Sequence, residues 1–288
     1  MNGITANAIK VEHLTKNYGN FTLRDVNLCL PTGSIMGLVG ENGAGKTTLF
    51  KLIMNVLERD EGEICVLGHD NLSPQFGELK NDIGVVLSGA GLPEYLTPTQ
   101  VNGVLRQTFR GWNESYFYQL LADFKLPESK TIKKFSTGMK MKLAIATALS
   151  HNPRLLLLDE PTSGLDPMVR EDILAVFNDF TRNPAHSILI SSHIVSDLEK
   201  ICDYIAFLHE GRLMFCEEKD RLLEDYALIK MPSAEFAAVP PGAVVSLRRE
   251  AYGIEALVKK HEIHPSFATE HTTLEDIILF LSKGGGTQ

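Results

Sequence analysis

The segment that most constrains the fold is a glycine-rich loop, Gly40–Thr48, with the pattern G-x-x-x-x-G-K-T. An apolar run, 34–39, precedes it, and apolar residues at helical spacing follow it through Met54. A strand, a glycine loop and a helix in this order form the context in which such a loop holds phosphate. Glycines let the backbone turn its N–H groups toward one point, where the helix start adds partial positive charge. A turn that merely joins a strand to a helix is the alternative that these flanks disfavour.

Every position of this loop is a candidate contact for a nucleotide. We expect the Lys46 ammonium to reach the β- and γ-phosphates, and the Thr47 hydroxyl to bind Mg²⁺. Both residues lie at the start of the predicted helix, which also attracts anions. The predicted contacts are Gly40, Glu41, Asn42, Gly43, Ala44, Gly45, Lys46, Thr47 and Thr48.

Two carboxylates follow a wholly apolar run near the middle of the chain. Asp159 and Glu160 come directly after residues 155–158, which are all leucine. Such a run is typical of a central parallel strand, and sheets of this kind bind ligands at the carboxyl ends of their strands. Because phosphoryl transfer depends mostly on positioning and charge, we predict that Asp159 holds Mg²⁺ with Thr47 and that Glu160 polarises the attacking water. A solvent-facing acid pair is the alternative.

Other candidate residues are less specific when taken alone. The Tyr18 ring either stacks on a nucleotide base or packs on the surface, and its spacing does not separate the two. Ser136 or Thr137 is predicted to cap a helix that has one apolar face. His193 ends a predicted buried strand, 187–193, where it is placed to donate a hydrogen bond to a γ-phosphate oxygen, although a lone histidine is more often structural.

Composition excludes several classes of protein. The chain has 288 residues, 44% of them hydrophobic and 22% charged, which is typical of globular domains. A formal net charge of −8 argues against general nucleic-acid binding. Neither a signal peptide nor a run of about 18 apolar residues is present, so we expect a cytosolic protein. The cysteines lack C-x-x-C spacing and are predicted to be free, buried thiols: Cys29, Cys65, Cys202 and Cys216.

Strand and helix patterns alternate along most of the chain, which predicts an α/β fold with a mostly parallel sheet. Segments 9–11, expected to be an edge strand, and 21–30 predict a small antiparallel layer beside the phosphate loop. A mostly helical insertion is predicted at about residues 97–150, beginning at a polar cap followed by proline.

The pattern changes after residue 216, and the remaining segment, 217–288, is predicted to be a small extension. A helix is expected at 220–229 and a short strand at 244–247. A capping box at 272–275 predicts a final helix, and residues 284–288 are expected to be disordered. This segment carries no recognisable chemistry, so we expect a packing, dimerisation or regulatory role.

Taken together, the motifs resemble those of the ATP-binding subunit of ABC transporters over roughly residues 9–215. The resemblance implies a P-loop NTPase with a RecA-like sheet, and an ATP-binding domain at 1–216. It also favours the stacking role for Tyr18, as the A-loop aromatic. The matching segments are Walker A at 40–48, the signature at 135–139, Walker B with its catalytic glutamate at 155–160, the D-loop at 161–166 and the switch histidine, His193.

Two segments depart from the family pattern. The signature, usually L-S-G-G-Q, keeps Ser136 and Gly138, which are expected to contact the γ-phosphate, and differs at its other three positions. The glutamine of the Q-loop is expected after the strand at 83–87, and Ser88 occupies that place. A serine hydroxyl can bind Mg²⁺ but has a shorter reach. Residues 89–96 are expected to meet a membrane partner.

The resemblance implies an ATPase whose two copies face each other head to tail. ATP would lie between the phosphate loop of one copy and the signature of the other. Glu160 would orient water, Lys46 and His193 would stabilise charge, and Asp166 would couple the two sites. The implied cofactors are ATP and Mg²⁺.

The implied partners are a second ATPase subunit, identical or paralogous, and integral membrane permease subunits at the inner face of the cell membrane. The short single chain is similar to subunits of bacterial exporters. A soluble, non-transporting clamp or regulator with the same module is the alternative function, and a binding-only module is another. Nucleic acid is not expected as a partner.

Overall fold

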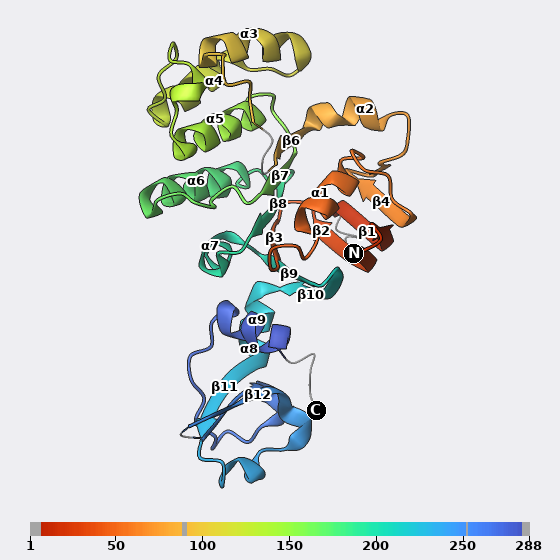
Figure 1. Cartoon of the computed structure of the whole chain (residues 1–288), viewed down its shortest axis with the longest axis vertical. Helices are drawn as coiled ribbons and strands as arrows, with labels where there is room; N and C mark the ends of the chain where they lie inside the picture. Colours follow the sequence, from red (N-terminus) through yellow and green to blue (C-terminus); the bar gives the residue numbers. More distant parts are fainter. Residues whose placement is uncertain (1–6, 88–90, 252, 284–288) are drawn as a thin grey trace.

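The computed structural model describes residues 7–87, 91–251 and 253–283, and a six-stranded sheet forms its centre (Figure 1). The strand order is β10-β9-β3-β8-β7-β6. Neighbouring strands are parallel except for the antiparallel β9–β10 hairpin, which confirms the predicted sheet. The strands are β3 (Ile35–Val39), β6 (Ile83–Val86), β7 (Leu155–Asp159), β8 (Ser187–Ser192), β9 (Tyr204–His209) and β10 (Arg212–Glu218).

The burial of strand β7 on both faces explains why its sequence is continuously apolar. All four leucines of this strand have no exposed surface. Leu156 and Leu158 belong to one hydrophobic core, and Leu155 and Leu157 belong to a second core on the other face of the sheet. A strand that is covered on both faces needs apolar side chains at every position. The apolar run ends at Asp159, the last residue of β7, at the carboxyl end of the strand.

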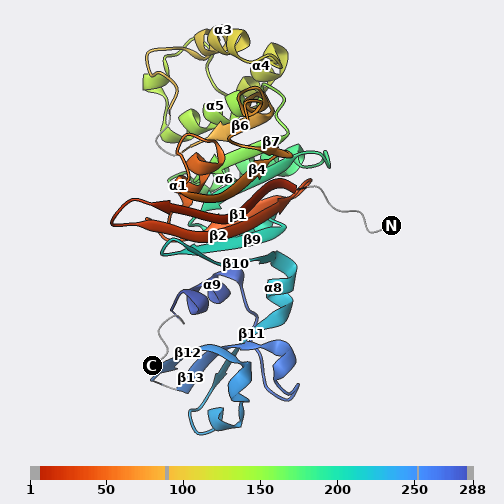
Figure 2. The ribbon, with the colours of Figure 1, turned by 90° about the vertical axis from the view of Figure 1, so that its right-hand side faces the viewer.

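A four-stranded antiparallel sheet lies beside the central sheet, in the order β2-β1-β4-β5 (Figure 2). Its strands are β1 (Asn7–Asn17), β2 (Thr22–Pro31), β4 (Glu61–Val66) and β5 (His69–Asp70). The antiparallel layer was predicted, but the edge position expected for residues 9–11 is wrong, because β1 pairs with β2 on one side and with β4 on the other. Ile9 and Val11 are accordingly buried.

Helices α3–α5 form the predicted insertion at one end of the molecule (Figure 1). A capping box between Thr97 and Gln100 starts α3, and the side chain of Asn113 caps α4. Phe117 and Leu143 belong to the apolar core that these helices share. The α-helices up to the extension are α1 (Lys46–Ile53), α2 (Phe76–Leu79), α3 (Pro98–Thr108), α4 (Glu114–Asp123), α5 (Thr137–Leu149), α6 (Pro167–Phe180) and α7 (Val195–Ile201).

The C-terminal segment forms a three-stranded antiparallel sheet, in the order β11-β13-β12, flanked by two helices. Helix α9 packs against α7 and β12, and the Arg248 guanidinium lies 4.3 Å from the centre of the Phe280 ring. The elements are α8 (Lys219–Asp225), β11 (Tyr226–Met231), β12 (Val244–Glu250), β13 (Gly253–Lys259) and α9 (Leu274–Lys283). Short 3₁₀ turns occur at Lys80–Asp82, Ile132–Lys134, Phe236–Ala238, Pro241–Ala243 and Lys260–Glu262.

Three expectations for this segment need correction. The helix expected at 220–229 ends at Asp225, and its last residues begin β11 instead, because they pair with β13. Strand β13 was not predicted. The capping contacts of α9 join Thr273 and Asp276, one residue later than expected: the Asp276 N–H donates to Thr273 Oγ1 at 3.2 Å and the Thr273 N–H to the Asp276 carboxylate at 3.0 Å. Residues 284–288 lie outside the described residues.

The four cysteines are free, as predicted, but only Cys202 is fully buried; Cys29 is exposed. No helix in the described part of the chain combines the length and the apolar character needed to cross a membrane.

Candidate active site

The phosphate loop connects β3 to α1 and depends on its glycines. Gly43 and Gly45 have φ angles of +86° and +110°, in the region that side chains with a Cβ rarely adopt. A Cβ on Gly40 would overlap the carbonyl oxygen of Leu208 on β9. Gly45 is also the N-cap of α1, so the first N–H groups of this helix face the loop. The loop is thus a backbone cradle that a side chain would distort or fill.

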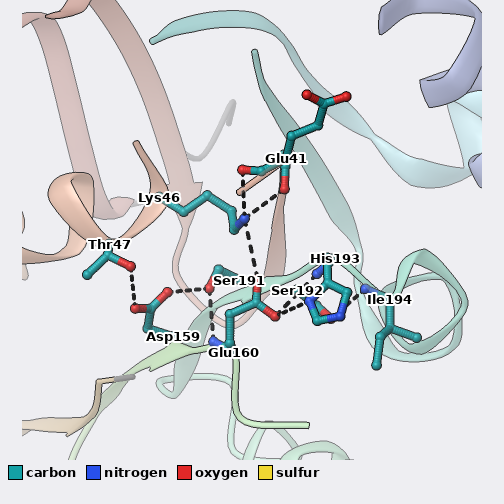
Figure 3. Close-up of polar contacts among 10 residues, drawn as sticks. Glu41, Lys46, Thr47, Asp159, Glu160, Ser191, Ser192, His193 and Ile194 are labelled. Carbon is teal, nitrogen blue, oxygen red and sulfur yellow. Dashed lines mark hydrogen bonds and ion pairs between the residues drawn. The ribbon is translucent and has the colours of Figure 1, made fainter. Parts of the chain in front are cut away.

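Lys46 lies across this cradle and is nearly buried, with 6% of its surface exposed. Its ammonium donates hydrogen bonds to the carbonyl oxygens of Gly40 at 2.7 Å and Glu41 at 3.2 Å (Figure 3). It also lies 3.3 Å from Oε1 of Glu160. The predicted phosphate-binding cation therefore rests on the loop backbone and on the predicted catalytic carboxylate.

Asp159 brings the two predicted magnesium ligands together. The Thr47 hydroxyl donates to Asp159 Oδ2 at 2.7 Å, although Asp159 follows Thr47 by 112 positions in the sequence. The Ser191 hydroxyl donates to Oδ1 at 2.7 Å. Asp159 is fully buried, so its carboxylate is oriented by these contacts rather than by bulk water.

Glu160, the first residue after β7, has a φ angle of +55°, which is rare for a residue other than glycine, asparagine or aspartate. Its N–H lies within hydrogen-bond distance of both the carbonyl oxygen and the hydroxyl of Ser191. Its Oε2 lies 2.6 Å from Nδ1 of His193. Its Oε1 is buried and accepts no hydrogen bond from the described residues, and the Lys46 ammonium is its near neighbour. The backbone is thus strained where the catalytic carboxylate is predicted.

Lys46, Thr47, Glu160 and His193 line a cleft of about 550 Å³ that suits a nucleotide phosphate chain, and the buried Asp159 reaches it through its contact with Thr47. A hydroxyl and a carboxylate in contact supply the hard oxygen ligands that Mg²⁺ prefers, with the remaining positions left for water and phosphate. The described residues hold no group of three or more His, Cys, Asp or Glu side chains able to bind a metal by themselves. The residues therefore fit Mg²⁺ held jointly by Thr47, Asp159 and a nucleotide.

A second cleft of about 790 Å³ shares residues 41–43 with the first and extends toward the β9–β10 hairpin. Phe21, the residue directly before β2, lines both clefts, and the sequence analysis did not predict it. Its only sequence signal is an aromatic ring three residues after Tyr18. The Tyr18 ring itself is 43% exposed and does not line either cleft, so its base-stacking role stays a prediction.

The signature residues lie apart from the residues that line the two clefts. Ser136 is exposed and is the N-cap of α5, where its hydroxyl accepts from the Met139 N–H at 3.2 Å, as predicted. Neither Ser136 nor Gly138 lines the two clefts described above. Asp166 is also exposed and caps α6. Ser88, the remaining predicted metal ligand, lies outside the described residues.

Comparison with known proteins identifies the family. A family model described as ABC transporter matches residues 23–163. The ABC transporter ATP-binding protein YtrB of Bacillus subtilis (strain 168) is 34% identical over 77% of this chain and 76% of its own length. The lantibiotic transport ATP-binding protein SrtF of Streptococcus pyogenes is also 34% identical, over 74% of this chain and 91% of its own length.

A solved structure of an ATP binding subunit of an ABC transporter superposes with a TM-score of 0.66 at 28% identity. The superposition covers 75% of this chain and 91% of that structure. The residues that the family model matches, 23–163, include the phosphate loop, the β7 acid pair and the helical insertion described above. The chain therefore belongs to the ATP-binding subunits of ABC transporters, and it is an ATPase that energises transport.

Proposed function

We propose that this chain hydrolyses ATP at the Glu160 centre to power export through separate membrane proteins. The observation that carries the proposal is the position of the Glu160 carboxylate, with Lys46 Nζ 3.3 Å from one oxygen and His193 Nδ1 2.6 Å from the other. A carboxylate fixed in this way at the end of a strand is placed to orient water toward a phosphoryl group.

The Lys46 contacts indicate how the site responds to ATP. The same ammonium that faces Glu160 is the group predicted to reach the β- and γ-phosphates. When it turns to the phosphates, Glu160 is free to hold water, while His193 still restrains the second carboxylate oxygen. Mg²⁺, held by Thr47 and Asp159, would neutralise charge on the phosphate oxygens.

The exposed start of α5 supports a site shared between two copies of the chain. Helix α5 has 13 residues, and Ser136 occupies its N-cap, where a helix attracts an anion. Because Ser136 and Gly138 do not line the clefts of their own chain, a second copy is the natural source of the phosphate that they bind. Each ATP would then join two subunits, and hydrolysis would loosen them. Asp166, exposed at the cap of α6, is proposed to couple the two sites.

The test is the variant Glu160→Gln with ATP and Mg²⁺. The amide cannot accept a proton from water, so we expect turnover to fall by about 10²–10⁴-fold, the usual contribution of a general base. Trapped ATP should then hold a dimer that size-exclusion chromatography and mass photometry detect. Adding Ser136→Arg to this variant should abolish the dimer, because the long side chain blocks the shared phosphate site.

Glu12→Gln is the matched control, because Glu12 is a half-exposed carboxylate on β1 that pairs only with Lys10 among the described residues. It should leave turnover and oligomeric state unchanged. Unchanged turnover in Glu160→Gln would contradict the role of Glu160. A variant that retains ATP but stays monomeric when purified alone would point to a paralogous partner and against a homodimer.

Permease partners and export are proposed from the relatives. SrtF is named a lantibiotic transport ATP-binding protein, and we propose that this chain likewise serves transport through separate membrane chains. Pull-down of the tagged chain from detergent-solubilised membranes should recover integral membrane proteins in an ATP-dependent manner. Recovery of soluble partners alone would favour the clamp or regulator function.

A further inference from the structure

Ser191 is a buried residue of β8 that no motif of the chain includes. It has no exposed surface, and it pairs in register with Asp159 of the neighbouring parallel strand β7. Residues paired in this way place their side chains on the same face of the sheet. Ser191 therefore lies directly beside the predicted magnesium ligand, two residues before His193.

One hydroxyl connects the two acidic residues of the site. The Ser191 O–H donates to Asp159 Oδ1 at 2.7 Å, and its oxygen accepts from the Glu160 N–H at 3.0 Å (Figure 3). A serine hydroxyl has one hydrogen to donate and two lone pairs, so both bonds form at once. The Thr47 hydroxyl holds the other oxygen of Asp159, so Ser191 contributes, together with Thr47, to the orientation of this carboxylate.

The second bond acts on Glu160, whose backbone is in the left-handed region. This conformation is costly for glutamate and persists only where neighbours enforce it. The carbonyl oxygen of Ser191 lies 3.2 Å from the Glu160 N–H, and the hydroxyl adds the shorter contact. The direction in which the Glu160 side chain leaves the strand therefore depends on Ser191.

We propose that Ser191 is a positioning residue for ATP hydrolysis, which fixes the magnesium-binding carboxylate and the water-orienting glutamate in one geometry. The inference rests on the function proposed above for Asp159 and Glu160. Ser191 itself touches neither nucleotide nor water in this scheme, and it acts through its two neighbours.

The experiment compares Ser191→Ala, which removes the hydroxyl, with Ser191→Thr, which keeps it. Losing a residue that orients a metal ligand typically lowers metal affinity or activity by about 10–100-fold. We expect Ser191→Ala to lower kcat by that factor and to weaken Mn²⁺ binding to the ADP-bound protein, measured by electron paramagnetic resonance, by about 10-fold. Binding of ADP in EDTA, where no metal takes part, should change by less than about twofold, and Ser191→Thr should stay within about threefold of wild type in every measurement.

Ser187→Ala is the matched control, because Ser187 is a buried serine of the same strand whose hydroxyl accepts from the Gly33 N–H at 3.0 Å, away from the site. It should lower the melting temperature without changing kcat or Mn²⁺ affinity. If Ser191→Ala fails to fold, Ser191→Cys keeps the size of the side chain with a weaker hydrogen-bonding group and should show the same losses.

Three outcomes are decisive. Ser191→Ala with normal kcat and normal Mn²⁺ affinity would overturn the inference. Equal losses of ADP binding in EDTA and of Mn²⁺ affinity would also overturn it, because they would show a merely structural role. A wild-type chain without ATP turnover would refute the proposed function instead, while the Mn²⁺ comparison would still judge Ser191.

Discussion

The contact between Lys46 and Glu160 predicts a measurable coupling in the nucleotide-free protein. Only 7% of the Lys46 side chain and 15% of the Glu160 side chain are exposed, and their charged atoms lie 3.3 Å apart. Lys46→Met removes the cation while roughly keeping the length of the side chain. It leaves Glu160 Oε1 buried beside an apolar group, without its cationic neighbour.

The size of the effect follows from the distance and the burial. Coulomb's law at an effective dielectric constant of about 20 gives an attraction of about 5 kcal/mol at this separation. Burial of both charges offsets much of that attraction, and His193 still contacts Oε2, so we expect Lys46→Met to lower the free energy of unfolding by about 2–3 kcal/mol. In the background of Glu160→Gln, which removes the charge, the same change should cost about 2 kcal/mol less, within the range of coupling found for contacting residues.

Urea unfolding in EDTA, followed by circular dichroism on the wild type, both single variants and the double variant, measures this coupling. The exposed pair Lys10–Glu12 is the control cycle: its atoms are closer, at 2.8 Å, but its side chains are 44% and 45% exposed, so no measurable coupling is expected. Additivity of Lys46→Met and Glu160→Gln within about 0.5 kcal/mol would refute the reasoning, because contacting buried charges must couple.

Two further predictions concern the stability of the fold outside the site, at His151 and at Gly211. Burial lowers the pKa of His151, which stacks on Phe109. The unfolded chain therefore takes up a proton near pH 6.5 that the native state does not, and the free energy of unfolding should fall as the pH drops below that value. Urea titration should show a smaller fall in His151→Phe. Gly211 and Gly68 both have positive φ, but only a Cβ on Gly211 would overlap the Thr22 carbonyl. Gly68→Ala should cost about 1–2 kcal/mol, and Gly211→Ala about 1–3 kcal/mol more, by thermal unfolding; equal losses would refute the clash.

The ATP-binding part of the fold was predictable because its signals are local. The glycines of the phosphate loop indicate its conformation, and the apolar run of β7 indicates that this strand is buried on both faces. Parallel strands end at one edge, so Lys46, Asp159, Glu160 and His193 were expected to meet without any knowledge of distances. The contacts in the structure join these residues in one network, as the contacts of Lys46 and His193 with Glu160 show.

The C-terminal segment was harder because its pattern has no single period. Ala227, Leu228 and Ile229 are consecutive buried residues of β11, and periodicity alone cannot distinguish such a short apolar run from a buried helix segment. Leu228 belongs to the main core, whereas Ala227 and Ile229 belong to a separate cluster on the opposite face of the sheet. Only the pairing with β13 decides between strand and helix, and β13 is distant in sequence.

Ser191 and Phe21 show that residues near the site also escape prediction when their positions depend on tertiary structure. Phe21 lines the two clefts because the chain passes beside the phosphate loop where β2 begins, a tertiary contact that the spacing from Tyr18 does not indicate. The role of Ser191 arises from strand register: shifting β8 by one residue against β7 would put Ser192 opposite Asp159 and turn the Ser191 hydroxyl to the other face of the sheet. Motifs therefore name the groups that touch the nucleotide, whereas the residues that orient those groups follow from how neighbouring strands align. The coupling measurement tests Lys46 and Glu160, which belong to the groups that touch the nucleotide. The metal-affinity measurement tests Ser191, which belongs to the residues that orient those groups.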